Sequence, residues 1–147
     1  MSEEVCVTIT REENFRFSVD FGPGMAAMIA DEPVPIGEGA GPSPEQMLAA
    51  AVANCLSASL VFALRKFKED PGKLTATAMC KTGRNEQNRL RVIGIEVAIE
   101  LGAEPQSSSQ LERALAQFEN FCTVSQSVKS GIPYSVTVKG ADGRILK

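Results

Sequence analysis

The sequence predicts a single α+β domain over residues 1–147. Three observations support this prediction: several short runs alternate apolar and polar residues, one long apolar run starts with helix-capping residues, and 147 residues suffice for one core. Hydrophobic residues make up 44% of the chain, which is ordinary for a globular protein and too high for a disordered one. A compact fold is therefore expected.

The N-terminal part predicts a β-hairpin. Residues 5–10 and 15–21 alternate, and the polar residues 11–14 lie between them as a turn. Residues 25–30 predict a further short strand. The Pro- and Gly-rich segment 31–41 predicts a loop, and we expect its acidic residues to be solvated (Asp31, Glu32 and Glu38).

A long helix is predicted to follow this loop. Ser43 is a typical N-cap, Gln46 completes a capping box, and Pro44 and Glu45 favour the first turn. The helix is predicted to end near Lys68. It is apolar nearly all round, and the polar residues in its middle favour burial over a membrane span (Asn54, Ser57 and Ser59). Because one small domain can hardly surround such a helix, we expect a partner subunit.

The C-terminal half predicts two strands, two helices and a last strand. The strands cover residues 73–82 and 90–101, and the second changes phase near Gly94 as a β-bulge would require. A capping box at Ser109 predicts a helix whose apolar stripe places Cys122 on the core side. A short helix at 123–130 and a strand at 134–138 complete the predicted elements.

Composition excludes several function classes. The chain has no histidine, which removes the general base of Ser-His-Asp and Cys-His hydrolases and the commonest zinc ligand. The net charge of −3 provides no electrostatic footprint for nucleic acid. We therefore expect no nucleic-acid partner. The N-terminus lacks the basic and apolar regions of a secretory signal, so a cytoplasmic location is expected.

Four cysteines are spread along the chain without a CxxC pair (Cys6, Cys55, Cys80 and Cys122). A free cysteine is usually a small buried apolar residue, so spacing alone identifies none of them as catalytic. A redox role would require a lowered thiol pKa and a second thiol that resolves the oxidised first one.

Two segments resemble the OsmC/Ohr family. GPSPEQMLAAAVANC, residues Gly41–Cys55, is similar to the segment that ends at the family's peroxidatic cysteine. CTVSQSVKSGIP, residues Cys122–Pro133, looks like the motif that begins at its resolving cysteine. The order of predicted elements also matches over nearly the whole chain. The resemblance implies an OsmC-like fold with antiparallel sheets around a long buried central helix, in an intertwined homodimer with redox sites at its interface.

The resemblance also implies reduction of organic hydroperoxides by a two-cysteine mechanism that uses no metal and no cofactor. Cys55 would attack the peroxide, Cys122 would resolve the resulting sulfenic acid as a disulfide, and an external dithiol would reduce that disulfide. Glu45 corresponds to the family's orienting carboxylate. It lies about 15 Å before Cys55 along the helix, so it would act on the cysteine of the partner subunit or only stabilise its own helix terminus.

This sequence departs from the family pattern at a basic residue. The loop 31–41 contains no Arg or Lys, and Arg11 and Arg16 are the only arginines upstream of it. We expect Arg16 to be a solvated strand residue. An ordinary thiol is mostly protonated at neutral pH, so two alternatives stay open. One is a non-peroxidatic dimer of the same fold that binds a small apolar ligand or a partner in its interface cleft, and the other is a purely structural dimer.

Further expectations concern Thr123, the two cysteines outside the motifs, and the aromatic residues. Thr123 stands where the family usually has Pro, which affects the backbone at Cys122. Cys6 and Cys80 match neither motif and are expected to fill space within strands. Four aromatic residues could line a pocket, although helical spacing is more typical of core residues (Phe62, Phe67, Phe118 and Phe121).

Overall fold

The computed structural model of the chain describes residues 2–104 and 108–147. These residues form two compact units, of which the first ends at Leu48 and the second begins at Ala49. Each unit is described here by itself. The prediction of one domain over residues 1–147 stays a prediction.

The first unit contains a three-stranded antiparallel sheet in the order β1 (Thr8–Glu13), β2 (Arg16–Asp20) and β3 (Met28–Ala30). The predicted hairpin is confirmed, but its first strand lies later in the chain than residues 5–10. The turn forms around Asn14, which adopts a positive φ of 46°, because asparagine tolerates that conformation better than most residues. A register shift between Arg11 and Glu13 accommodates the added length of β1.

The loop after β3 is organised by a buried carboxylate. Asp31 is only 3% exposed, so the prediction that it is solvated is wrong. Its oxygens accept backbone N–H groups from Glu32 at 2.8 Å and from Glu38 and Ala40 at 3.1 Å. These bonds, with that from Ala40 foremost, lower the pKa of Asp31 against the opposing effect of burial.

The start of helix α1 (Pro44–Lys66) confirms the predicted capping box. The Ser43 N–H donates to Gln46 Oε1 at 2.9 Å, and the Gln46 N–H donates to Ser43 Oγ at 3.3 Å. The helix ends slightly before the predicted Lys68, which has a positive φ of 59°. By length and composition alone α1 could cross a membrane, which is weak evidence because core helices of soluble proteins pass the same test; 44% of its most apolar window is buried.

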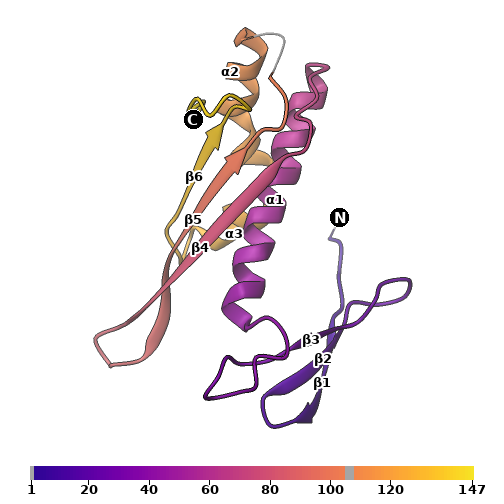
Figure 1. Cartoon of the computed structure of the whole chain (residues 1–147), viewed down its shortest axis with the longest axis vertical. Helices are drawn as coiled ribbons and strands as arrows, with labels where there is room; N and C mark the ends of the chain where they lie inside the picture. Colours follow the sequence, from indigo (N-terminus) through magenta and orange to yellow (C-terminus); the bar gives the residue numbers. More distant parts are fainter. Residues whose placement is uncertain (1, 105–107) are drawn as a thin grey trace. The chain divides into compact units, whose positions relative to one another are not determined.

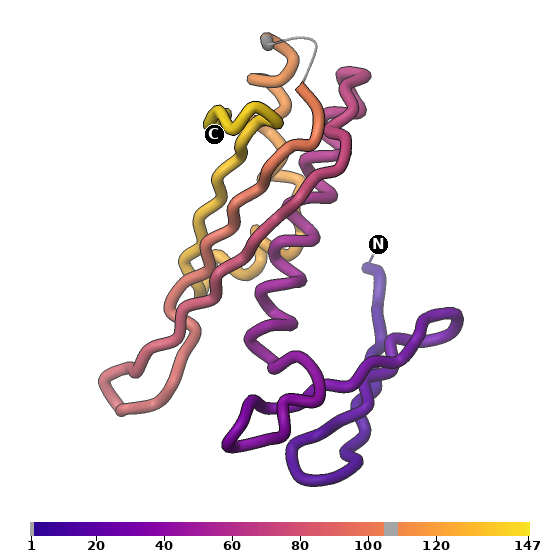
Figure 2. Tube along the Cα trace, viewed as in Figure 1, coloured from indigo at the N-terminus to yellow at the C-terminus, as the bar shows by residue number. Residues whose placement is uncertain are grey.

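The second unit contains a sheet in the order β4 (Thr75–Arg84), β5 (Leu90–Glu100) and β6 (Tyr134–Lys139) (Figure 1). Lys81 pairs with Gly94 and Thr82 with Val92, so Ile93 is the extra residue of the predicted bulge. The turn between β4 and β5 extends beyond the part of β5 that β6 covers (Figure 2).

The expected antiparallel pairing joins β4 to β5, whereas β6 pairs with β5 in parallel. The reason is the connection: helical segments link β5 to β6, and such a crossover returns the chain in the same direction. These segments are α2 (Ser108–Gln117), the 3₁₀-helix η1 (Phe118–Phe121) and α3 (Thr123–Val128). Because α2 already includes Ser108, Ser109 lies inside the helix and not at the predicted N-cap.

One face of the β4-β5-β6 sheet is buried. Burial alternates along β5, with Ile95, Val97 and Ile99 almost fully buried. Strand pairing places Cys80 and Tyr134 in one row with Ile95, on this same face. The face packs against the helices of this unit, whose buried residues on α1 repeat with helical spacing (Val52, Leu56, Leu60, Ala63 and Leu64).

Candidate functional site

The structure brings two of the four cysteines together in the second unit. Cys55 lies in the middle of α1 and is partly exposed, whereas Cys122 lies between η1 and α3 and is 0% exposed. Both are free thiols, and Cys55 lies close enough to Cys122 to raise the pKa of the Cys122 thiol. A partly exposed cysteine therefore lies beside a fully buried one.

Cys122 is held by its position as the N-cap of α3. Its backbone is extended, with φ −84° and ψ 97°, and its Sγ accepts the N–H of Ser125 at 3.4 Å. The sulfur thus takes the place of the oxygen in an ordinary Ser or Asp cap. Thr123 occupies the first helical position, so its departure from the family pattern leaves the cap intact.

The surroundings of Cys122 favour its neutral form. Burial is the main cause that raises its pKa, and the neighbouring Cys55, through its thiol and through its charge as a thiolate, acts in the same direction. The bonds from Ser125 oppose this effect. The raised pKa therefore favours a protonated Cys122 thiol at neutral pH.

Next to Cys122 lies a cluster of polar side chains that the sequence did not reveal, formed by Tyr134, Glu119 and Lys147. The Tyr134 hydroxyl donates to Glu119 Oε1 at 3.1 Å, and Glu119 Oε2 forms an ion pair with Lys147. Burial is the main cause that raises the pKa of Tyr134, and its neighbours include Ser125 and Cys122. The only signal in the sequence is that the single tyrosine shares its alternation with Val136 and Val138.

Glu45, the third predicted site residue, lies in the first turn of α1 and is exposed. Its position agrees with a role at the helix terminus, where a carboxylate is favourable. Its action on a thiol of a partner subunit stays a prediction.

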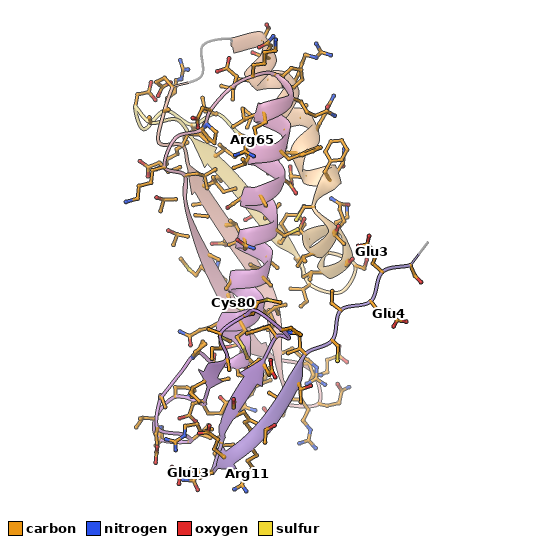
Figure 3. The ribbon with its side chains drawn as sticks, turned by 90° about the vertical axis from the view of Figure 1, so that its right-hand side faces the viewer. Glu3, Glu4, Arg11, Glu13, Arg65 and Cys80 are labelled. Carbon is orange, nitrogen blue, oxygen red and sulfur yellow. The ribbon has the colours of Figure 1, made fainter. Side chains whose placement is uncertain are left out.

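The two upstream arginines have local partners in the first unit. Arg11 Nε donates to Asn14 O at 2.8 Å, and Arg11 and Glu13 both lie at the end of the hairpin (Figure 3). Arg16 pairs with three carboxylates, at 3.1 Å, 2.7 Å and 3.5 Å (Glu12, Glu13 and Glu38). Arg16 lies in β2 with a partly exposed side chain, as expected of a solvated strand residue. The charges of its three partners, that of Glu13 foremost, raise its pKa.

The remaining candidates separate into surface and core residues. Cys6 is exposed and precedes β1, so its assignment as strand filler is wrong, whereas Cys80 lies in β4 as predicted. Phe62 and Phe121 form an edge-to-face pair at 6.2 Å with Lys66 over both rings, while Phe118 is buried. Within residues 2–104 and 108–147, no group of three metal-ligating side chains is close enough to hold an ion.

Comparisons with known proteins agree on one family and one fold. The family model described as OsmC-like protein matches residues 37–137. A structure of an OsmC-like protein of unknown function from Vibrio cholerae is 17% identical, with a TM-score of 0.79 over 93% of this chain and 99% of that one. An organic hydroperoxide resistance protein OsmC from Legionella pneumophila is 16% identical, with a TM-score of 0.69 over 92% and 96%.

A third structure, the organic hydroperoxide resistance protein OhrB of Bacillus subtilis, is 16% identical, with a TM-score of 0.66 over 93% of this chain and 98% of that one. At these identities the structures establish the fold alone. A sequence search of curated proteins gave no match.

Proposed function

The chain belongs to the OsmC-like protein family, and from this premise we propose that it reduces organic hydroperoxides through the thiols of Cys55 and Cys122. The observation that supports this proposal is the proximity of these two thiols, which come from distant parts of the sequence. Two similar structures carry the name of organic hydroperoxide resistance proteins, which points to the same chemistry.

In the proposed cycle the Cys55 thiolate attacks the peroxide O–O bond. The bond breaks, the alkoxide leaves with a proton as an alcohol, and Cys55 becomes a sulfenic acid. The Cys122 sulfur then attacks the Cys55 sulfur, and the S–O bond breaks with release of water. An external dithiol reduces the resulting disulfide and is itself oxidised. The cycle uses no metal and no cofactor.

Burial supports the proposed roles of the two cysteines. Cys55 is partly exposed and can meet a substrate, whereas Cys122 is 0% exposed and can meet only its neighbour. An external dithiol should likewise reach the Cys55 sulfur first, so that Cys122 is the leaving group. We assign Cys55 as the attacking residue and Cys122 as the resolving residue.

The proposal extends to the assembly and its setting. It places the protein in the cytoplasm as a homodimer, whose second subunit would bring Glu45 towards the Cys55 of the first. A reducing compartment agrees with free thiols at all four cysteines.

Serine variants of the cysteines test the proposal. Cys55→Ser should lower the rate of cumene hydroperoxide reduction at least about a hundredfold, because the attacking sulfur is lost. Cys122→Ser should consume one equivalent of peroxide and then stop as a sulfenic acid. The matched control is Cys6→Ser, at an exposed thiol of the first unit, and should stay within about twofold of wild type. A Cys55→Ser variant with wild-type activity would refute the assignment.

A second candidate function is binding of an apolar ligand without peroxidase activity. An apolar groove of about 360 Å³ lies in the first unit, and aromatic side chains form part of its wall (Phe15, Phe17 and Phe21). Thiol labelling at about pH 6 separates the candidates: a reactive Cys55 thiolate favours the enzyme, and an inert one favours the binding protein.

A further inference from the structure

Glu119 links Cys122 to other elements of the second unit. It lies in η1, which ends directly before Cys122. Its backbone oxygen accepts the Cys122 N–H at 3.1 Å and Gln126 Nε2 at 2.9 Å. These two bonds tie the N-cap of α3 and a side chain of α3 to one carbonyl group. The position of Cys122 therefore depends on the position of Glu119.

The side chain of Glu119 is held at both of its oxygens. Oε1 accepts the Tyr134 hydroxyl at 3.1 Å, and Oε2 forms an ion pair with Lys147. Tyr134 is fixed in turn, because it belongs to β6 and pairs with Ile95 of β5. Two charge-assisted contacts thus set the orientation of the carboxylate.

Lys147 connects this carboxylate to two further elements. Its Nζ donates to Leu115 O of α2 at 2.6 Å and lies 4.9 Å from the centre of the buried Phe118 ring. Its backbone N–H and C=O both bond to Val138 of β6, at 3.2 Å and 3.0 Å. The side chains of Lys147 and Glu119 are only 31% and 25% exposed, so removal of one charge leaves the other partly buried without a partner.

We infer that the ion pair of Glu119 with Lys147 positions Cys122 for its attack on Cys55. This role rests on the proposed function, because the attack is the second step of the proposed cycle. In that step the S–S bond forms, the S–O bond of the Cys55 sulfenic acid breaks, and the leaving hydroxide takes the Cys122 proton as water. Glu119 and Lys147 are positioning residues, since they act through Cys122 and do not contact the peroxide.

The geometry of a disulfide makes its closure sensitive to such positioning. A disulfide forms only within a narrow range of distances and dihedral angles, so a small displacement of the η1–α3 junction should slow it strongly. Cys55 belongs to α1, which takes part in none of the bonds described above. Loss of the ion pair should therefore slow the step that Cys122 carries out and spare the step that Cys55 carries out.

A disulfide-exchange assay measures these two steps one after the other. In a full-length Cys6→Ser/Cys80→Ala background, Cys55 reacts with 5,5′-dithiobis(2-nitrobenzoate) and releases one thionitrobenzoate anion. Cys122 is 0% exposed, so the reagent reaches Cys55 first. Cys122 then attacks the Cys55 sulfur, the mixed disulfide breaks, and a second anion leaves while the buffer takes the Cys122 proton.

Lys147→Met removes the charge and keeps an unbranched side chain. It should leave the first release within about twofold of the parent protein and slow the second about tenfold. Lys147→Arg keeps the charge and should recover most of the second rate. Glu119→Gln removes the other charge of the pair and should slow the second release in the same way. The control Lys139→Met makes the same change of charge at an exposed residue of β6 and should match the parent.

Equilibration with glutathione separates positioning from a general loss of stability. The ratio of disulfide to dithiol gives the effective concentration of Cys122 towards Cys55, which should fall about tenfold in Lys147→Met. A general loss of stability would lower the urea midpoint and leave this ratio unchanged in the absence of urea.

Four results would overturn the positioning role. They are a parent-like second release in Lys147→Met, an equal deficit in Lys147→Arg, an equal deficit in Lys139→Met, and a parent protein that releases no second anion. Cumene hydroperoxide given to the same parent protein tests the proposed function separately. If the peroxide is not consumed while Lys147→Met slows closure and Lys147→Arg restores it, the proposed function fails and the positioning role stands.

Discussion

Two buried side chains, those of Cys122 and Asp31, are held in place by hydrogen bonds from backbone N–H groups. Cys122 Sγ accepts one such group from Ser125, and the Asp31 carboxylate accepts three from its own loop. Both side chains lie where the backbone would otherwise leave donors unpaired. Their local geometry fixes one half of the thiol pair in the second unit and the loop before α1 in the first.

The lowered pKa of Asp31 predicts how the stability of the fold depends on pH. Because its pKa is lowered in the folded state, the unfolded chain binds the proton more readily in the acidic range. The stabilisation is present above the ordinary Asp pKa of about 3.9 and is lost as pH falls through the lower folded value. Asp31→Asn should therefore lower the urea midpoint at neutral pH and flatten its fall in acid.

Urea midpoints between about pH 2.5 and 6 measure this effect. The control Glu3→Gln makes the same change of charge at an exposed residue of the irregular N-terminal segment. An acid dependence of Asp31→Asn equal to that of wild type would show that the loop bonds do not contribute.

At the level of elements, α1 is only half covered by its own chain. Its buried residues occupy one side, and an exposed stripe of small and apolar residues occupies the other (Ala50, Ala51, Asn54, Ala58 and Phe62). Such a stripe allows close approach of a second helix. This agrees with the proposed dimer, in which two copies of α1 would pack together.

The stripe predicts the effect of a charge on assembly. Ala58→Glu places a carboxylate at its centre and should convert a dimer into a monomer in sedimentation velocity, because the charge would be buried without a partner. Ala116→Glu makes the same change on the exposed side of α2 and should leave the assembly unchanged. The idea fails if both variants sediment as the wild type does.

For the whole molecule, local signals predicted the elements and nonlocal contacts limited the prediction. The capping box at Ser43 and the bulge near Gly94 depend on adjacent residues, and both were predicted correctly. The parallel pairing of β6 depends on the path of α2 and α3, which no local pattern specifies. The shifted β1 depends on which polar residue adopts the turn conformation.

In the candidate site, too, some residues were found from sequence motifs and others only from the packing of distant segments. Cys55 and Cys122 were singled out by resemblance to two motifs, whereas their spacing alone did not distinguish them from Cys6 and Cys80. Tyr134 and Glu119 join the cluster only through the packing of β6 beside η1, so sequence reasoning could not find them. The ion pair of Arg16 with Glu38 was likewise hidden, because Glu38 lies in a loop far along the chain.

The pairing of Cys55 with Cys122 is the central claim, and disulfide mapping tests it most directly. The fully reduced protein is treated with one equivalent of cumene hydroperoxide, blocked with an alkylating reagent and digested without reductant. Mass spectrometry should find a single Cys55–Cys122 disulfide, with Cys6 and Cys80 alkylated. A different pair, or four alkylated cysteines after the peroxide has been added, would contradict the account.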